Sequence, residues 1–469
     1  MKKKKDDYDV TLNLSFIFLK VQYFEKAIEF GKYAIDIQEN RPQAYQNLSH
    51  SHFFLENYDE AEKFCLKAIE IRGGFDSGNF LDTEDLVLLY GDILIAKNRK
   101  DDFIKFALKI SDKKYIQRVL IRLLREDPSK ITKQHLDMAN EAIEKSKNLE
   151  KKVDRNTRES DARFFLAEFY NKNDKAVSEE NYIKANQLIS DMQRESLFMR
   201  QKYARAIYDF FKKFDYSQIK NIDKNKGDGL IFILGMPRSG TSLIESILST
   251  AENLTTGGEK SFFSVQLFQT ITDLIDKEDL NIDEKFFMDL GDRYLEQIKL
   301  QRKDNHYFVD KLPENYLFLE FIRIAFPSAK FIHSYRDPWD NAISLFKQNY
   351  SINIFYASSF FGIATEYANY EFIMNFWKGI NHEEIFNVKY EDLIKSENEI
   401  TNKLWDFFGF QGKYLPEKRK EHFTYTASMQ QISKEIYDSS IEKSDFIDFK
   451  LKFMQDLENQ RKYWQNRLN

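Results

Sequence analysis

The sequence has few of the residues that cross-link a protein or bind metals. Cys65 is the one cysteine among 469 residues, and there are seven histidines. A single cysteine excludes a disulfide framework within the chain and a cysteine cluster for a metal. The histidines fall at no spacing typical of metal ligands, so we expect no metal site. These features favour a reducing, cytoplasmic setting.

Long hydrophobic runs are missing as well. No stretch reaches the roughly 18 consecutive apolar residues that a membrane-spanning helix needs. The lysines at positions 2–5, ahead of the apolar residues 12–19, imitate a signal peptide, but Asp6, Asp7 and Asp9 interrupt the pattern. We therefore expect neither a signal peptide nor a membrane span.

The chain also lacks an excess of positive charge. Lysine and arginine number 70 against 75 aspartates and glutamates, which gives a formal net charge of −5. A general nucleic-acid binder neutralises many phosphates, so this class is excluded and any basic site must be local. The hydrophobic fraction of 42% is enough for real cores, and the length predicts two or three domains.

The N-terminal half contains a repeat with a period of 34 residues, because Ala27 recurs as Ala61 at that interval. Other pairs follow the same interval: residues 13–15 with 47–49, Phe24 with Tyr58, and residues 34–35 with 68–69. The period, with alanines where two helices approach closely, resembles the tetratricopeptide repeat (TPR). Residues 12–19 then form the first helix of the first repeat rather than a leader.

Later copies of the repeat are degenerate. We predict helices at 86–96, 102–110, 134–146, 162–170, 182–189 and 203–214. Stacked helix pairs bury a continuous core and leave a concave surface, which could bind a peptide or protein partner. The alternative, that the repeats are only a scaffold, stays open. We expect the TPR-like helical domain to span residues 1–222, followed by a polar linker up to Gly229.

The strongest single motif lies at residues 229–244. Five apolar residues, 230–234, predict a buried parallel strand, Gly235 and Gly240 bracket a tight loop, and helical spacing begins at Ser242. A strand that turns into a helix in this way directs backbone N–H groups and the positive end of the helix dipole at one point. The motif predicts a site for a phosphate or another oxyanion.

The spacing of the two glycines resembles a P-loop, but the usual lysine is replaced by Thr241. Arg238 supplies a positive charge from inside the loop, and its guanidinium group can grip a phosphate or sulfate through two hydrogen bonds. An ordinary glycine turn in an α/β domain is the alternative interpretation.

Beyond this loop, strands and helices alternate. We predict strands at 306–309, 330–334 and 385–388, and helices at 314–326, 339–348 and 397–408. Such alternation predicts a parallel sheet covered by helices on both faces, with ligands at the carboxyl ends of the strands. Polar residues follow these ends: 238–242, 255–259, Asp310 and Lys311, 336–344, and 389–392.

Four motifs in this order resemble the sulfotransferase family, in particular its TPR-containing bacterial members and the tyrosylprotein sulfotransferases. They are residues 236–243, Gly258 with Glu259, residues 336–338 with Ser344, and residues 390–393. The resemblance covers roughly residues 229–437. It implies an α-helical TPR-like solenoid followed by an α/β, P-loop-like sulfotransferase domain with a central parallel sheet, which we expect at residues 228–469.

The resemblance also implies a ligand, 3′-phosphoadenosine 5′-phosphosulfate, which donates the sulfuryl group. In the family, the loop after the first strand binds the 5′-phosphosulfate, and an arginine and a serine bind the 3′-phosphate. The residues implied to bind the donor are Arg238, Ser239, Gly240, Thr241, Ser242, Arg336, Ser344, Tyr390, Ser428 and Lys434. A salt bridge of Arg336 with Asp337 or Asp340 is the alternative for that arginine.

Three residues are implied to carry the transfer. Glu259 occupies the position of the catalytic base in the tyrosylprotein enzymes, and Gly257 and Gly258 are expected to leave room for the acceptor. Arg238 and Lys311 are the cations expected beside the leaving oxygen, and no metal is implied. A salt bridge to Glu314 is the alternative for Lys311.

The sequence departs from the family pattern at Ser433 and Glu435, in the segment that closes over the nucleotide. Three functions therefore stay open: a sulfotransferase acting on a hydroxyl of a peptide, glycan or small molecule; a P-loop kinase or NTPase; and an inactive transferase that serves as a TPR interaction protein. Thr241 counts against the kinase, since phosphoryl transfer in P-loop enzymes uses the missing lysine.

Overall fold

The computed structural model describes residues 7–78, 83–111, 116–190, 197–277, 282–302, 306–350, 352–380, 385–419 and 445–468. The chain forms two compact units, Met1–Asn181 and Tyr182–Asn469. None of the helices within these described ranges is long and apolar enough to cross a membrane.

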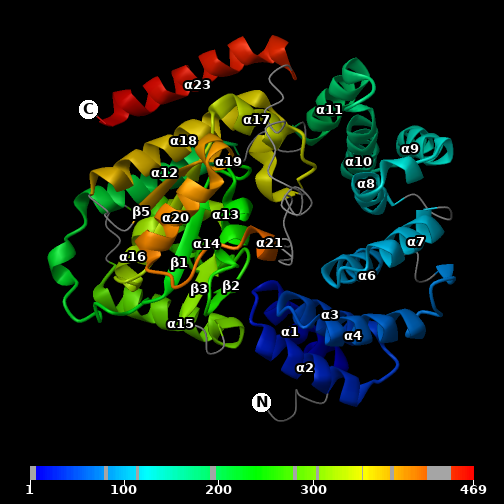
Figure 1. The fold of residues 1–469 in the computed structure, drawn as a ribbon, viewed down its shortest axis with the longest axis horizontal. Helices are drawn as coiled ribbons and strands as arrows, with labels where there is room; N and C mark the ends of the chain where they lie inside the picture. The colour runs from blue at the N-terminus through cyan, green and yellow to red at the C-terminus, as the bar shows by residue number, and fades with distance from the viewer. Residues whose placement is uncertain are drawn as a thin grey trace. The chain divides into compact units, whose positions relative to one another are not determined.

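The first unit is entirely helical in its described part. Its helices are α1 (Tyr8–Lys20), α2 (Phe24–Ile37), α3 (Pro42–Phe54), α4 (Tyr58–Ile71), α6 (Glu84–Ala96), α7 (Lys100–Ser111), α8 (Gln117–Glu126), α9 (Lys133–Ser146), α10 (Lys152–Tyr170) and α11 (Lys175–Ser190), which crosses the division at Asn181 (Figure 1). Each helix predicted here is present, and α8 is an additional one. The predicted helical solenoid is confirmed.

The repeat is visible in the hydrogen bonds between the helices of each pair. Ser15 Oγ donates to the carbonyl oxygen of Ala27 at 2.9 Å, and Ser49 Oγ donates to that of Ala61 at 2.7 Å. Both alanines are fully buried between the two helices of their pair. A larger side chain at either position would keep the helices apart. The same interaction therefore recurs one repeat later.

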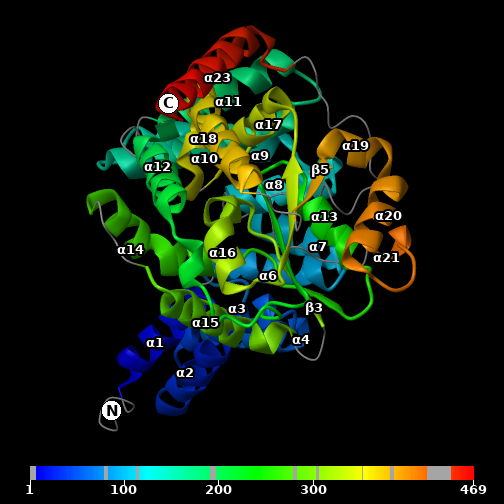
Figure 2. The same cartoon turned by 90° about the vertical axis from the view of Figure 1, so that its left-hand side faces the viewer.

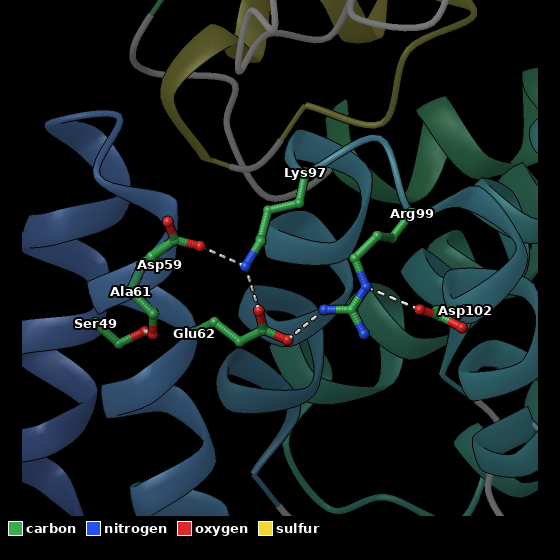
Figure 3. Close-up of polar contacts among 7 residues, drawn as sticks. All are labelled: Ser49, Asp59, Ala61, Glu62, Lys97, Arg99 and Asp102. Atoms are coloured by element: carbon green, nitrogen blue, oxygen red, sulfur yellow. Dashed lines mark hydrogen bonds and ion pairs between the residues drawn. The ribbon is translucent and has the colours of Figure 1, made fainter.

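Charged side chains link α4 to the turn between α6 and α7 (Figure 3). Lys97 Nζ lies 2.6 Å from Asp59 Oδ1 and 2.7 Å from Glu62 Oε2. Arg99 bonds to the other Glu62 oxygen at 2.6 Å and to Asp102 at 2.8 Å. Glu62 thus connects two cations of the following helix pair, and this contact joins neighbouring repeats.

The second unit is built around a five-stranded parallel sheet with the order β2-β3-β1-β4-β5. Its strands are β1 (Leu230–Gly235), β2 (Leu254–Thr256), β3 (Tyr307–Asp310), β4 (Lys330–Tyr335) and β5 (Ile385–Lys389). Strand β1 lies between β3 and β4, with Ile231 in register with Val309 on one side and Lys330 on the other. The predicted parallel sheet is confirmed, and β2 is a short strand that the sequence did not reveal.

Helices cover both faces of this sheet. The described helices that follow α11 are α12 (Leu197–Lys213), α13 (Thr241–Leu248), α14 (Phe262–Asp276), α15 (Glu284–Arg302), α16 (Leu319–Ala325), α17 (Pro338–Phe346), α18 (Phe360–Gly379), α19 (Tyr390–Lys395), α20 (Glu397–Phe408), α21 (Pro416–Arg419) and α23 (Ile447–Leu468), with 3₁₀ turns η4 (Pro313–Phe318) and η5 (Ile352–Ser358). Of these, α23 packs on α18 rather than on the sheet.

The two faces differ in their cores. Ile231 and Ile233 of β1 pack with apolar side chains of α13, α19 and α20, and Figure 2 shows these helices on one side of the strands. Phe232 points to the opposite face, where its ring contacts Phe263 of α14 and Tyr294 of α15. Alternate residues of one apolar run therefore serve two cores, as expected for a sheet buried on both faces.

The compact units divide earlier than the domain boundary expected from the sequence. Helix α12 precedes the predicted linker, yet Phe211 contacts Phe321 of α16 and Trp377 of α18 in the second unit. Packing thus assigns α12 to the sheet-containing unit. That the TPR-like domain ends at residue 222 and the sulfotransferase domain begins at residue 228 remains a prediction from the sequence.

Candidate functional site

The loop between β1 and α13 has a backbone that requires its glycines. Gly235 has φ of +150° and Gly240 has φ of +102°, and a Cβ at Gly235 would lie 2.1 Å from the carbonyl oxygen of Ser334 on the neighbouring strand. Arg238 also adopts a positive φ of +69°, which non-glycine residues seldom do. Such local strain is typical of functional loops.

The hydroxyl groups of this loop are buried where α13 begins. Ser239, Thr241 and Ser242 are all buried, and Ser239 Oγ has no hydrogen-bond partner within the described part of the chain. A buried hydroxyl in this position, beside the first N–H groups of a helix, is available to an oxyanion. This geometry agrees with the interpretation of the loop as an anion site.

Arg238 reaches from the loop to a second element. Its Nε atom donates a hydrogen bond to Ser344 Oγ on α17 at 3.0 Å. Helix α17 follows β4, the strand next to β1, and its N-cap residue Asp337 accepts hydrogen bonds from the N–H groups of Trp339 and Asp340. The structure thus brings together the residues predicted for the two ends of the nucleotide.

Arg336 lies at the same edge of the sheet. The centre of its guanidinium group is 4.5 Å from the ring centroid of Tyr390, which begins α19. A Cβ at Gly240 would come within 2.5 Å of the same ring, so Tyr390 lies against both Gly240 and Arg336. Asp337, one of the two alternative partners of Arg336, caps α17 with its carboxylate. Burial raises the pKa of Asp340, the other alternative partner, and the charge of Arg336 opposes this rise. The three residues from separate loops form one cluster.

Glu259 and Lys311 meet because backbone hydrogen bonds join the segments that carry them. The N–H of Gly257 donates to Val309 O at 2.7 Å, and the N–H of Lys311 donates to Gly258 O at 3.0 Å. Lys311 Nζ then bonds to Glu259 Oε1 at 2.6 Å. Glu314, the alternative partner, instead pairs with Arg200 at 3.0 Å. The predicted base and the predicted cation are an ion pair.

The two glycines before Glu259 differ in the space around their Cβ positions. A Cβ at Gly257 would lie 2.3 Å from the ring of Phe308, so this glycine serves close packing on β3 and leaves no room for an acceptor. Gly258 has φ of +66° with nothing within 4 Å of a Cβ position. The expectation is therefore wrong for Gly257, whose space is filled by Phe308.

Asp310 is buried at the end of β3 beside this pair. Its carboxylate accepts a hydrogen bond from Tyr294 OH at 2.9 Å, and Asn315 Nδ2 lies 3.4 Å from it. Burial raises the pKa of Asp310 to about 7, and the hydrogen bond from Tyr294 and the charge of Lys260 oppose this rise. Asp310 therefore holds the strand end in place from within the core.

Tyr350 begins an aromatic loop that the sequence suggests for the acceptor pocket, but no sequence motif assigned this side chain a role of its own. Its hydroxyl group is buried without a hydrogen-bond partner in the described ranges. Burial raises the pKa of this phenol, with Arg238 lowering it and Glu259 raising it, so Tyr350 experiences the field of both predicted catalytic residues. The one sequence signal was its place in an aromatic stretch that follows α17.

Ser428 and Lys434, the remaining predicted nucleotide contacts, lie outside the described residues, as do the divergent Ser433 and Glu435. The structure thus brings together Arg238, Ser344 and the cluster of Arg336, Tyr390 and Gly240 along the ends of β1, β4 and β5. It pairs Glu259 with Lys311 at the ends of β2 and β3. All of these ends lie at the carboxyl edge of one sheet.

Comparison with known proteins gives the family context of both parts. Residues 231–413 match the sequence model of the sulfotransferase family, and residues 42–74 match that of the tetratricopeptide repeat. The sulfotransferase match includes every candidate site residue that the structure describes. The predicted resemblance to sulfotransferases with TPR repeats is confirmed at this level.

Individual relatives are distant. An uncharacterized protein of Aquifex aeolicus (strain VF5) is 30% identical over 284 residues, which are 56% of this chain and 36% of that protein, so the chain spans about a third of the relative's length. Crystal structures of sulfotransferases from Mycobacterium tuberculosis and Mycobacterium avium are each 12% identical, with TM-scores of 0.27 and 0.28. They cover 67% and 66% of this chain, and 98% and 96% of their own chains.

Proposed function

We propose that this chain transfers a sulfuryl group from 3′-phosphoadenosine 5′-phosphosulfate to a hydroxyl group of an acceptor. The observation that carries the proposal is the hydrogen bond of Arg238 with Ser344, beside the cluster of Arg336 and Tyr390. A phosphate loop by itself provides one anion site. Two arginines at the ends of adjacent strands provide for a ligand with two separated anionic groups, as this donor has.

In the proposed assignment, the β1–α13 loop binds the 5′-phosphosulfate. Arg238, Ser239, Gly240, Thr241 and Ser242 provide its charge, hydroxyl groups and backbone N–H groups. Arg336 and Ser344 bind the 3′-phosphate, with Tyr390 stacked on the Arg336 guanidinium. Ser428 and Lys434 remain predicted contacts from the sequence.

The proposed reaction is an in-line displacement at sulfur. Glu259 takes the proton of the acceptor hydroxyl as its oxygen attacks, and the bond between sulfur and the bridging oxygen of the nucleotide breaks. Negative charge develops on that bridging oxygen, which leaves with 3′-phosphoadenosine 5′-phosphate. Fixed cations beside this oxygen stabilise the transition state, and Lys311 and Arg238 have this role in the proposal.

A P-loop kinase or NTPase is less well supported. In such enzymes an aspartate at a strand end commonly holds Mg²⁺. Here the corresponding Asp310 is buried and bonded to Tyr294 within the core. The place of the P-loop lysine is occupied by Thr241. An inactive transferase remains the second alternative. Its only support is the departure from the family pattern at Ser433 and Glu435.

The test is nucleotide binding by the full chain. We expect 3′-phosphoadenosine 5′-phosphate to raise the melting temperature equally with Mg²⁺ and with a chelator. Stabilisation by ATP with Mg²⁺, and none by the bisphosphate, would overturn the proposal. Nucleotide binding without transfer of labelled sulfate to any fraction of a cell lysate would support the inactive transferase.

The acceptor and the partner of the repeats are part of the proposal only as classes. The acceptor is a hydroxyl compound: a peptide, a glycan or a small molecule. A peptide or protein bound by the TPR-like helices is consistent with the matched repeat. The cytoplasmic setting stays a prediction from the composition.

A further inference from the structure

We propose that Glu245 positions Lys311 for the reaction by holding its ammonium group from the buried side. This inference rests on the proposed function, which gives Lys311 and Glu259 their roles. Glu245 belongs to α13, the helix that follows the phosphate loop, and none of the sequence motifs singled it out.

The geometry places Lys311 between two carboxylates. Its Nζ atom lies 2.6 Å from Glu259 Oε1 and 3.9 Å from Glu245 Oε2. The side chain of Lys311 is 0% exposed, that of Glu245 is 1% exposed, and that of Glu259 is 45% exposed. One carboxylate is thus fixed inside the protein, and the other is open to the surface from which an acceptor arrives.

This difference in exposure separates the roles of the two glutamates. A buried ammonium group loses its hydration and needs an opposite charge close by. In the proposed reaction, Glu259 must exchange Lys311 for the acceptor hydroxyl, which removes the nearer charge at the moment when Lys311 is needed at the leaving oxygen. Glu245 cannot turn to solvent, so it keeps Lys311 paired and in place throughout.

Glu245 also ties Lys311 to the phosphate loop. The residue lies in the second turn of α13, whose first turn contains Thr241 and Ser242. Strand β3, which precedes Lys311, pairs directly with β1, which precedes the loop. A carboxylate that bridges these two segments fixes the distance between the cation and the oxyanion site, and small displacements of such groups are costly for catalysis.

The test compares charge with shape at position 245. Glu245→Gln keeps the shape and removes the charge, whereas Glu245→Asp keeps the charge and shortens the side chain. We measure transfer of labelled sulfate into a lysate fraction at varied donor concentrations, together with affinity for 3′-phosphoadenosine 5′-phosphate. Ser246→Ala is the matched control, because Ser246 is buried on the same helix and its hydroxyl group donates to the carbonyl oxygen of Leu243 in its own helix.

We expect Glu245→Gln to lower the apparent kcat about 10- to 100-fold, with the donor KM and the bisphosphate affinity close to those of the wild type. Glu245→Asp is expected to retain more activity than Glu245→Gln, and Ser246→Ala to retain nearly all of it. A Lys311→Met background should also abolish the effect of Glu245→Gln, because Glu245 acts through Lys311.

Two outcomes would overturn the inference while leaving the proposed function intact. One is a wild-type rate in Glu245→Gln. The other is higher activity in Glu245→Gln than in Glu245→Asp, which would show that packing matters and charge does not. Absence of bisphosphate binding and of sulfate transfer in the wild type would instead overturn the proposed function, and with it this role of Glu245. If Glu245→Gln does not fold, the activity of Glu245→Asp is compared with that of Ser246→Ala. Equal activity in the two variants supports the role of the charge at position 245. An inactive Glu245→Asp variant overturns it.

Discussion

Arg238 donates from Nε to Ser344 Oγ at 3.0 Å across 106 residues of sequence. The loop after β1 and the helix after β4 are therefore joined by a side-chain hydrogen bond in addition to the pairing of their strands. A ligand that moves one of these segments is therefore expected to move the other as well.

Arg336→Ala is expected to weaken binding of 3′-phosphoadenosine 5′-phosphate about 10- to 100-fold. A hydrogen bond to a charged group contributes about 1.5–3 kcal/mol, and about 1.4 kcal/mol corresponds to a tenfold change in affinity. Isothermal calorimetry measures the change. Arg293→Ala removes an exposed arginine of α15 and should bind like the wild type. Equal affinity in the two variants would show that Arg336 does not contact the nucleotide.

Gly240→Ala is expected to destabilise the second unit by about 1–3 kcal/mol and to weaken nucleotide binding. The alanine would have to adopt the φ of +102° that Gly240 has, and its Cβ would lie 2.5 Å from the Tyr390 ring. Gly379→Ala is the control, since nothing lies within 4 Å of a Cβ at the end of α18. Denaturant unfolding with and without the bisphosphate separates the two variants. A Gly240→Ala protein as stable as the control would contradict the close approach of Tyr390.

Glu259→Gln is expected to bind the bisphosphate normally and to lose turnover by about 10²- to 10⁴-fold, the range for removal of a general base. The amide still fills the space beside Lys311 but cannot accept the acceptor's proton. Labelled-sulfate transfer measures turnover, and calorimetry measures binding. Full turnover in this variant would mean that another residue is the base.

The free energy of unfolding of the second unit should fall as the pH rises from about 4 to about 7, because of one buried group, Asp310. Burial raises the pKa of Asp310 from 3.8 to about 7, so the folded state holds a proton that the unfolded state has released in this range. Above pH 7 both states are ionised and the slope ends. Asp310→Asn should remove this part of the pH dependence, and the exposed Asp406→Asn should keep it. Unfolding free energies measured from pH 4.5 to 8.5 give the slopes, and identical slopes in the two variants would refute the role of Asp310.

Glu62→Gln is expected to destabilise the first unit by about 1 kcal/mol at pH 7 and by much less at pH 3. Burial alone would raise the pKa of Glu62, but hydrogen bonds from Lys97 and Arg99 outweigh it and hold the pKa below its usual value. A lowered pKa stabilises the folded state above the unfolded pKa, and this contribution is lost as the pH falls. Urea unfolding at both pH values, with Glu60→Gln as the control on the same helix, measures the difference. An equal cost at both pH values would count against the ion pairs.

Local patterns determined the elements of this protein. The 34-residue interval of Ala27 and Ala61 predicted the helix pairs, because only small side chains allow two helices to approach at these points. The apolar run of β1 and the glycines at 235 and 240 predicted the strand, the loop and the helix, since backbone conformation depends on nearest neighbours. The order of the strand-end motifs also predicted which polar residues stand at the carboxyl ends of the strands.

The pairing of side chains between segments was decided by the tertiary structure. Sequence placed Lys311 near a possible partner, Glu314, because the two are close in the chain, but β3 and the turn before Glu259 are joined by backbone hydrogen bonds that no local pattern encodes. Glu245 stood out in no motif, since a glutamate on a short helix is usually a solvent-exposed residue. Only the sheet order, which sets β1 between β3 and β4, buries it beside Lys311. Sequence thus determined which residues stand at the strand ends, and the fold determined which of them meet, because those contacts depend on strand order and on burial far along the chain.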